Sequence, residues 1–235
     1  MKKTAKMFFF YCLLAAAFIV CVLMCDEAVT TLSENRPVPR KVCIVIDPGH
    51  GGEDGGAVSR SGIPESTYNL EISQRLNALL NLLGYDTEMI RTTDISIYTK
   101  GETLAQKKAS DLKERVKRIN ELDQAVLLSI HQNHYPDERY SGAQVFYANT
   151  EGSGELAQQL QTSFVSTLNP GSHRQAKKAS GIYIMEHIRC PGVLIECGFL
   201  SNHAEEAKLR DPEYQKKLCC IIAAELLSSL KTPPA

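Results

Sequence analysis

The chain has 235 residues and a formal net charge of −1. Hydrophobic residues make up 43% and charged residues 23%, proportions that are ordinary for a globular protein. A nearly neutral chain gives no electrostatic reason to expect a nucleic-acid partner, and its length suits one good-sized domain with an appendage.

The first 25 residues predict a membrane segment. Lys2, Lys3 and Lys6 precede an uninterrupted apolar stretch over residues 7–25, which is about long enough to cross a bilayer as a helix. Basic residues before this stretch and acidic residues after it predict that the rest of the chain lies outside the cytoplasm. A cleaved signal peptide, and so a secreted protein, is the alternative. No small-x-small cleavage site follows the apolar run, which favours a retained anchor.

The eight cysteines raise the question of disulfides, which are common in exported proteins. Cys12, Cys21 and Cys25 lie in or beside the membrane segment, and Cys219 and Cys220 are adjacent on a predicted helix. The remaining three lie in or next to apolar runs. We therefore expect buried free thiols, which behave as small hydrophobic groups. No CxxC pair is present, which argues against a cysteine zinc site.

A polar segment over residues 26–40 predicts a tether, and residues 41–232 then form the folded domain. In this domain, strand-like and helix-like segments alternate. Strands are predicted at residues 42–46, 87–91, 125–130, 143–148, 181–185 and 192–196. Helices are predicted at residues 70–83, 103–122, 153–168 and 205–230, the first capped by Gly84 and the last interrupted near Asp211-Pro212. The alternation predicts a single layered α/β domain with a twisted, largely parallel (mixed) sheet flanked by helices.

The stretch VCIVIDPGHGGEDGG, residues 42–56, carries the first candidate for chemistry. Its apolar start is rich in β-branched residues and predicts a strand that is buried on both faces. The proline and glycines that follow predict a tight loop at the strand end, where open α/β sheets bind their ligands. His50 in this loop is therefore a candidate metal ligand. Phosphate binding is disfavoured because neither GxGxxG nor the P-loop pattern occurs.

Further polar residues stand near the ends of predicted strands. His131 follows the strand over 125–130, Glu196 closes an apolar run, and Glu65 stands at the start of the first helix. Two histidines and one carboxylate can form a three-ligand zinc site with an open fourth position. A further carboxylate suits the general base of a hydrolase. The spacing leaves open which glutamate has which role, and the helical HExxH arrangement is absent.

Simpler interpretations exist for most of these residues. Glu65 is also what a helix N-terminus favours for electrostatic reasons, and Arg91 suits a surface ion pair. His134 follows His131 by three residues, and we expect it beside the site or at the surface. Glu196 is the hardest to explain structurally, because a carboxylate that emerges from a buried strand is costly unless it is paired or functional.

Four motifs occur in a fixed order along the chain. They are DPGHGG over 47–52, Glu65 with Asn69-Leu70, SIHQN over 129–133 and ECGFLSN over 196–202, with Arg91, Thr92 and Asp94 between the second and the third. Together they resemble the zinc-dependent N-acetylmuramoyl-L-alanine amidases of the family often called amidase type 3. The resemblance covers about residues 42–230.

The resemblance implies a site and a substrate. It assigns one zinc ion per chain to His50, Glu65 and His131, and the catalytic role to Glu196, with peptidoglycan as the partner. The bond to be hydrolysed joins the lactyl group of N-acetylmuramic acid to L-alanine. Arg91 and Asn133 are further candidates for contacts with substrate or oxyanion. The family usually has Ala-Asn-Ala after its second zinc histidine, and this chain departs from that pattern at residues 132–134.

The segment over residues 169–197 is similar to membrane-anchored spore-cortex amidases of endospore formers. In these enzymes, removal of the stem peptide leads to muramic-δ-lactam, which germination enzymes require. This likeness implies a chain anchored at the extracytoplasmic face of a membrane, and it leaves open whether an activator protein is needed. The alternatives are an amidase for daughter-cell separation, a zinc exopeptidase on stem peptides and a catalytically silent wall-binding regulator.

Overall fold

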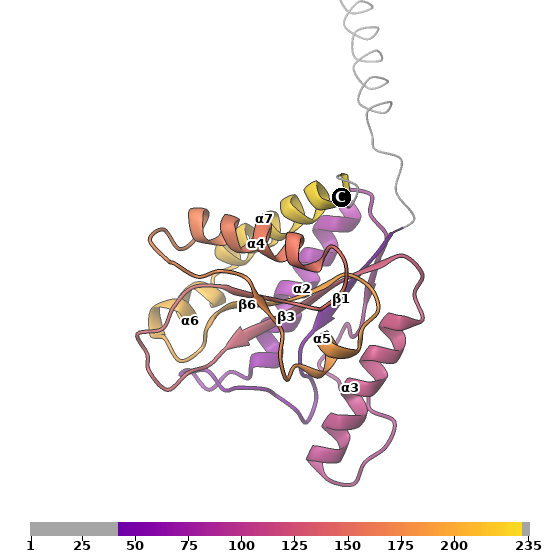
Figure 1. Cartoon of the computed structure of the whole chain (residues 1–235). Helices are drawn as coiled ribbons and strands as arrows, with labels where there is room; N and C mark the ends of the chain where they lie inside the picture. The colour runs from indigo at the N-terminus through magenta and orange to yellow at the C-terminus, as the bar shows by residue number, and fades with distance from the viewer. Residues whose placement is uncertain (1–41, 232–235) are drawn as a thin grey trace, which may run out of the picture. The chain divides into compact units, whose positions relative to one another are not determined.

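A six-stranded sheet lies at the centre of the computed structural model, which describes residues 42–231 (Figure 1). The strands are β1 (Cys43–Pro48), β2 (Thr87–Met89), β3 (Ala125–Asn133), β4 (Gln144–Tyr147), β5 (Lys177–Lys178) and β6 (Gly192–Phe199). Their order in the sheet is β2-β1-β3-β6-β4-β5, and the one antiparallel pair among them is β4 with β6. The prediction of a mixed, largely parallel sheet in an α/β domain is confirmed.

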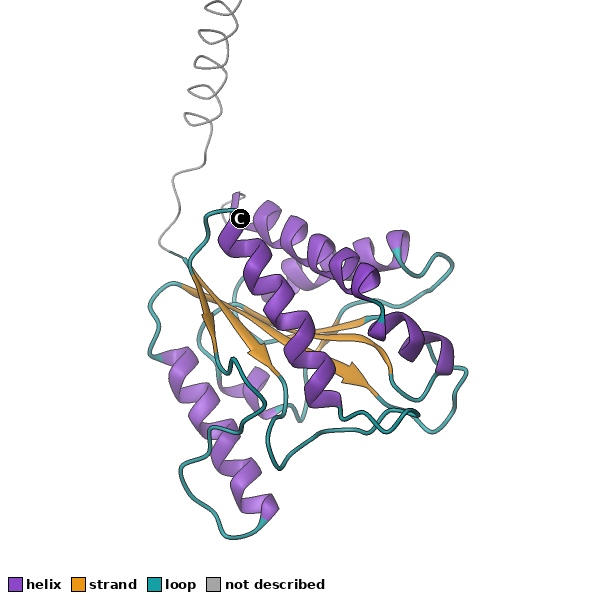
Figure 2. Ribbon diagram, turned by 180° about the vertical axis from the view of Figure 1, so that it is seen from behind, coloured by secondary structure: helices purple, strands orange, loops and turns teal. Residues whose placement is uncertain are grey.

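Helices cover both faces of this sheet (Figures 1 and 2). They are α2 (Glu65–Leu82), α3 (Leu104–Asn120), α4 (Ser153–Thr167), α5 (Tyr183–His187), α6 (His203–Arg210) and α7 (Pro212–Lys231). One apolar cluster joins α2, α4 and α7 to one face, and a second joins α3 and α5 to the other. Because both faces are covered, the central strands are apolar throughout: Ile44, Val45 and Ile46 of β1 are all fully buried.

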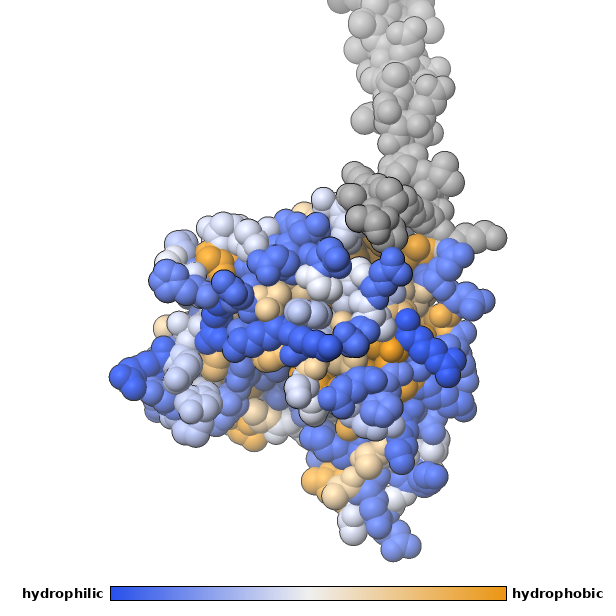
Figure 3. All heavy atoms as spheres, in the orientation of Figure 1, coloured by the Kyte–Doolittle hydropathy of each residue, from blue (hydrophilic) through white to orange (hydrophobic). Residues whose placement is uncertain are grey.

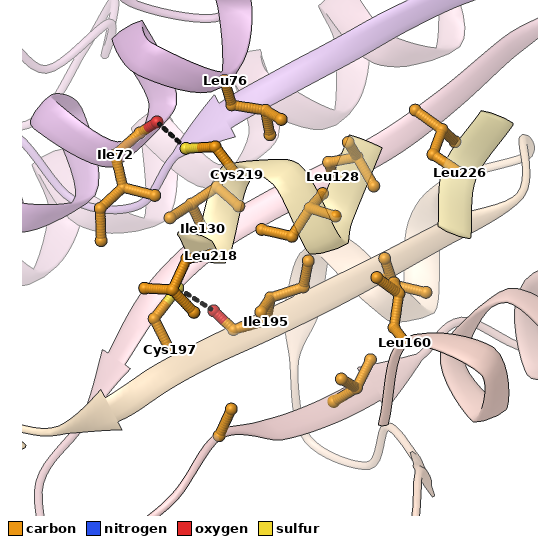
Figure 4. Packing of buried hydrophobic residues seen from close by; sticks show 14 of the residues in the cluster. Ile72, Leu76, Leu128, Ile130, Leu160, Ile195, Cys197, Leu218, Cys219 and Leu226 are labelled. Atoms are coloured by element: carbon orange, nitrogen blue, oxygen red, sulfur yellow. Dashed lines mark hydrogen bonds between the residues drawn. The ribbon is translucent and has the colours of Figure 1, made fainter. Parts of the chain in front are cut away.

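The larger apolar cluster is where α7 packs against α2 and the sheet (Figure 4). Cys219 of α7 donates its thiol to the carbonyl of Ile72 on α2, and Cys197 of β6 donates to the carbonyl of Ile195. All five cysteines of the described chain are free thiols, as expected. Only Cys197 and Cys219 are buried, however, and Cys220 is exposed.

Local signals explain where most helices begin and end. Thr103 and Gln106 form a capping box at the start of α3, in which each side chain accepts a hydrogen bond from the other residue's amide. Gly84 follows α2 with a φ of +82°, as the predicted cap requires. The predicted interruption near Asp211-Pro212 is confirmed, since α6 ends at Arg210 and α7 begins at Pro212.

The predicted strand over residues 181–185 is wrong, because residues 183–185 belong to the short helix α5. Gly181 has a φ of +71°, which ends the extended backbone, and its amide donates to the carboxylate of Glu186. The buried residues Ile184, Met185 and Ile188 then follow helical spacing and pack on the sheet. The strand in this region is instead β5, two residues long and earlier in the chain.

The predicted membrane segment and tether, residues 1–25 and 26–40, lie outside the described residues. Within residues 42–231, no helix combines the length and the apolar character needed to cross a bilayer. Hydrophilic residues dominate the face seen in Figure 3, where hydrophobic residues form small separate areas.

Candidate metal centre and active site

Three potential metal ligands meet beyond the carboxyl ends of β1 and β3. His50 comes from the loop after β1, Glu65 is the first residue of α2, and His131 lies near the end of β3. Their ligand atoms all lie within 4.8 Å of one another. Nε2 of His50 is 3.3 Å from Oε2 of Glu65, and Nδ1 of His131 is 3.0 Å from Oε1 of the same carboxylate. Two imidazoles and one carboxylate form a donor set that suits zinc and similar ions.

The glycines of the loop after β1 make room for these ligands. A Cβ atom at Gly49 would come within 2.2 Å of the His131 ring, and one at Gly56 within 2.6 Å of the Glu65 carboxylate. His50 itself has a φ of +60°, an uncommon conformation for a residue with a side chain. The glycine-rich sequence is therefore required because the backbone passes directly against the ligand side chains.

Asp54 orients His50 and was not predicted as a site residue. Its Oδ2 atom lies 3.0 Å from Nδ1 of His50 and 3.0 Å from Nζ of Lys108. A carboxylate at Nδ1 keeps a proton on that nitrogen, so Nε2, which faces Glu65, is the nitrogen that can lose its proton and bind a metal. The signal in the sequence is an acidic residue four positions after the histidine, in the same loop.

The Glu65 carboxylate is fixed by the surrounding backbone and side chains. It accepts hydrogen bonds from the Ala57 amide, the Gln132 amide and the side chain of Asn69, each at 3.1 Å. Burial alone would raise the pKa of Glu65, but hydrogen bonds and charge from His131 and His50 hold it well below its usual range. Glu65 is therefore an ionised carboxylate, the state that a metal ligand needs.

His50 shows the opposite effect. Burial lowers the pKa of this imidazole, but its hydrogen bonds with Asp54 and Glu65 outweigh burial and raise the pKa to about 9. In the metal-free protein, His50 is therefore protonated on both ring nitrogens at neutral pH. A metal ion that binds Nε2 must displace the proton from that nitrogen.

Glu196 lies beside this group, on β6, opposite His131 in the strand register. Its Oε2 atom is buried and, within the described chain, has no hydrogen-bond partner. Burial raises the pKa of Glu196 to about 7, although the charges of His131 and His50 act in the other direction. A carboxyl group with this pKa can both accept and donate a proton near neutral pH. The unpartnered oxygen has no hydrogen bond to the described chain that a reaction would have to break.

Arg115 of α3 supports the loop after β1. It is fully buried and forms ion pairs with Asp47 at 2.5 Å and Asp111 at 2.6 Å. It also donates to the carbonyls of Pro48 and His50, at 2.9 and 2.7 Å. The backbone on both sides of Gly49 is thereby tied to a helix that is distant in the sequence.

Arg91 has a similar position. Its guanidinium is buried and donates four hydrogen bonds, to the carbonyls of Pro48, Gly49, Ser66 and Thr93. These partners favour a role in supporting the loop over the expected contact with substrate or oxyanion.

The other two residues considered lie at the end of β3 and just beyond it. Asn133 is half-buried, its carbonyl accepts from the Leu200 amide, and its side chain makes no hydrogen bond within residues 42–231. His134 is exposed and does not belong to the group of metal-ligand candidates found in that part of the chain.

Comparisons with known proteins agree on one family. Residues 44–227 match the protein family described as N-acetylmuramoyl-L-alanine amidase. The germination-specific N-acetylmuramoyl-L-alanine amidase of Bacillus subtilis (strain 168) is 38% identical over 193 residues, which cover 81% of this chain and 80% of that protein. The amidase LytC of the same organism is 30% identical over 177 residues, and the match covers 74% of this chain but only 32% of LytC.

Among solved structures, the CwlD amidase from Clostridioides difficile, in complex with the GerS lipoprotein, is similar with a TM-score of 0.76 and 33% identity. That match covers 80% of this chain and 98% of the CwlD chain. An N-acetylmuramoyl-L-alanine amidase from Clostridium difficile 630 gives a TM-score of 0.71 at 31% identity, covering 81% of this chain and 97% of that one.

Proposed function

Because the chain belongs to the N-acetylmuramoyl-L-alanine amidase family, we propose that it is a zinc enzyme that acts on the peptidoglycan of the spore cortex. The bond that it hydrolyses is the amide between the lactyl group of N-acetylmuramic acid and L-alanine. The observation that carries the zinc assignment is the convergence of His50, Glu65 and His131, whose donor atoms lie within 4.8 Å of one another.

The donor set fits zinc in type and in number. Two imidazoles and a carboxylate leave a fourth position open, as in catalytic zinc sites, and a zinc ion held there polarises a carbonyl and lowers the pKa of water. Asp54 holds Nδ1 of His50, so Nε2 is the nitrogen that would bind the metal. Arg115 and Arg91 keep the loop in place through hydrogen bonds to its carbonyls.

Glu196 acts as the general base and then as the general acid. Its buried, unpartnered Oε2 atom accepts the proton of the attacking water and returns it to the leaving amine of L-alanine. A pKa of about 7 suits both transfers, because neither protonation state is strongly favoured near neutral pH.

The chemistry is tested with the zinc-loaded full chain and purified cortex peptidoglycan. Mass analysis of the digest should find free stem peptides that begin with L-alanine, together with glycan strands that carry free lactyl groups. Release of single amino acids from the end of the stems would indicate the exopeptidase alternative. Intact muropeptides from a folded, zinc-loaded protein would indicate the wall-binding regulator.

The cortex assignment rests on the germination-specific relative, to which the chain is 38% identical. Deletion of the gene should leave growth and division intact and give spores whose cortex lacks muramic-δ-lactam. The lactam closes only after the lactyl carboxyl has been freed from its peptide, which is the reaction proposed for Glu196. Chains of undivided vegetative cells, with normal lactam in the spores, would favour a role in daughter-cell separation.

We further propose that the chain is anchored to a membrane and binds a lipoprotein partner. The apolar stretch over residues 7–25 anchors the chain at the outer face of a membrane, and N-terminal sequencing of the mature protein tests whether it is retained. The complex of the similar CwlD amidase with GerS supports a lipoprotein as partner. Purification of the tagged full chain from sporulating cells, followed by mass spectrometry, would identify it.

A further inference from the structure

A groove of about 470 Å³ begins at Gln144, the residue of β4 that is opposite Glu196 of β6. Its lining consists of Tyr140, Gln144, His173, Arg174, Gln175 and Lys177. In the sheet, Glu196 on β6 is opposite His131 of β3 on one side and opposite Gln144 of β4 on the other. The metal ligands, the proposed base and the groove therefore follow one another across neighbouring strands.

The groove lies over the face of the sheet that carries the site. Residues directly opposite one another on neighbouring strands share a face, so His131, Glu196 and Gln144 lie on the same face of the sheet. The register shifts after His131, so that Phe199 is opposite Asn133, and the guanidinium carbon of Arg174 lies 5.0 Å from the centre of the Phe199 ring. Arg174 also donates to the side chain of Gln144, the residue opposite Glu196, so a molecule bound at Glu196 can extend towards Arg174.

Arg174 is held in position but is not neutralised. Its Nε atom donates to the carbonyl of Ser141, and Nη1 donates to Oε1 of Gln144. Its Nη2 atom donates to no residue of the described chain, and no carboxylate in residues 42–231 pairs with it. Arg115, in contrast, is surrounded by carboxylates and carbonyls. A fixed guanidinium with open N–H groups is well prepared to bind a carboxylate through two parallel hydrogen bonds.

The remaining lining strengthens this charge. Lys177 lies exposed on β5, and none of the six lining residues is acidic. Resting on the function proposed above, we infer that this groove binds a free carboxylate of the peptidoglycan stem peptide, with Arg174 as the main contact and Lys177 as the second. On the glycan side of the scissile bond, the lactyl carboxyl is consumed in the amide itself. Beyond L-alanine, the stem continues with an acidic residue, which supplies a free carboxylate.

The test uses two muropeptides that differ in one group, the α-carboxylate of the D-glutamate after L-alanine, which is free in one and amidated in the other. For the zinc-loaded full chain, Arg174→Gln should lower kcat/KM on the free acid about 10- to 100-fold, the effect of one lost charged hydrogen-bond pair. Most of this loss should be in KM, because the contact exists before and during the reaction. On the amidated substrate, the same substitution should change kcat/KM less than about twofold.

Control variants separate charge recognition from damage to the fold. Lys178→Gln removes the same charge from a neighbouring exposed residue that does not line the groove, and it should leave both substrates unaffected. Lys177→Gln should lower kcat/KM on the free-acid substrate by a smaller factor than Arg174→Gln does. Arg174→Lys should recover part of the loss on the acid. Equal losses on both substrates for Arg174→Gln, with an unchanged melting temperature, would overturn the inference.

A binding measurement keeps the inference separate from the proposed activity. Calorimetry should find that L-alanyl-D-glutamate binds the wild-type chain and that Arg174→Gln abolishes this binding, whether or not the chain turns over any substrate. N-acetylmuramic acid, whose carboxylate is the freed lactyl group, serves as the competing ligand. Arg174-dependent binding of this sugar acid, without binding of the dipeptide, would refute the stem-peptide assignment. Failure to hydrolyse either muropeptide while the dipeptide still binds would refute the amidase proposal alone.

Discussion

Replacement of Asp54 by alanine should weaken zinc binding without removing a zinc ligand. Asp54 lies 3.0 Å from Nδ1 of His50 and is the group that directs Nε2 towards Glu65. A hydrogen bond to a charged group contributes about 1.5–3 kcal/mol. The Asp54 side chain is 22% exposed and is shared with Lys108. We therefore expect the lower part of this range, about 1.5–2 kcal/mol, or roughly a 10- to 30-fold weaker zinc affinity.

The assay is competition for zinc between the full chain and a chromophoric chelator above about pH 9, where His50 has lost its extra proton in the wild type and in the variant. Glu53→Gln is the matched control, because it removes a charge from the adjacent residue, which pairs with Lys107 and does not contact His50. This control should bind zinc like the wild type. Wild-type affinity in Asp54→Ala, or an equal loss in Glu53→Gln, would refute the argument that Asp54 acts by orienting His50.

Three further predictions follow from the same geometry. Glu196→Gln should keep its zinc and lose about 10²–10⁴-fold in kcat, whereas His131→Ala should lose zinc. Metal analysis and turnover assays of both variants distinguish the two roles. Loss of zinc in Glu196→Gln would contradict the assignment. The pKa of His50 is raised in the metal-free fold, so protonation of His50 stabilises the fold fully below about pH 6.5, the usual pKa of histidine. This stabilisation is lost as the pH rises through about 9. The free energy of unfolding in urea, measured on the metal-free chain between pH 6 and 10, should follow this trend in the wild type and not in His50→Ala. Arg115→Met leaves two carboxylates without their buried partner and should lower the free energy of unfolding by about 3–5 kcal/mol, whereas Arg118→Met, at an exposed position of the same helix, should change it little.

Most of the sheet could be predicted because its central strands are buried on both faces. The runs over 42–46 and 125–130 are apolar without alternation, and turn residues or helical spacing bound each of them. The segment over 181–185 has the same apolar, β-branched appearance, and yet its residues 183–185 lie in α5. The conformation of this segment depends on the left-handed φ of Gly181 and on the hydrogen bond from the Gly181 amide to Glu186. The composition of the segment does not reveal either feature.

The candidate site was predictable to the extent that polar residues stand out at the ends of apolar strands. His50, His131 and Glu196 have this signature, and Glu65 is separated from the first loop by a short connection. The residues that hold these four side chains in place do not have this signature. Asp54 looks like one more polar residue of a loop, and Arg115 like one more cation on a charged helix, until the fold brings both against the loop after β1.

Arg91 and Arg174 illustrate the same limit in opposite directions. Arg91 follows a strand near the candidate site and suggests a catalytic cation, but its hydrogen bonds to loop carbonyls leave it with a supporting role. Arg174 lies in a segment with no catalytic motif, yet the fold holds it over Phe199 with Nη2 unused within the described chain. The sequence identifies both as cations, and only the count of satisfied donors separates the structural one from the one available to a ligand.

The strand order then constrains how a substrate can lie. The metal ligands belong to the β1 and β3 side of the sheet, Glu196 stands on β6, and the cationic groove begins at β4. A scissile carbonyl at the metal ligands and a stem carboxylate at Arg174 require the leaving amine between them to pass over Glu196. Under the proposed mechanism, Glu196 would then lie beside the amine that receives the proton, so one carboxylate could complete both transfers.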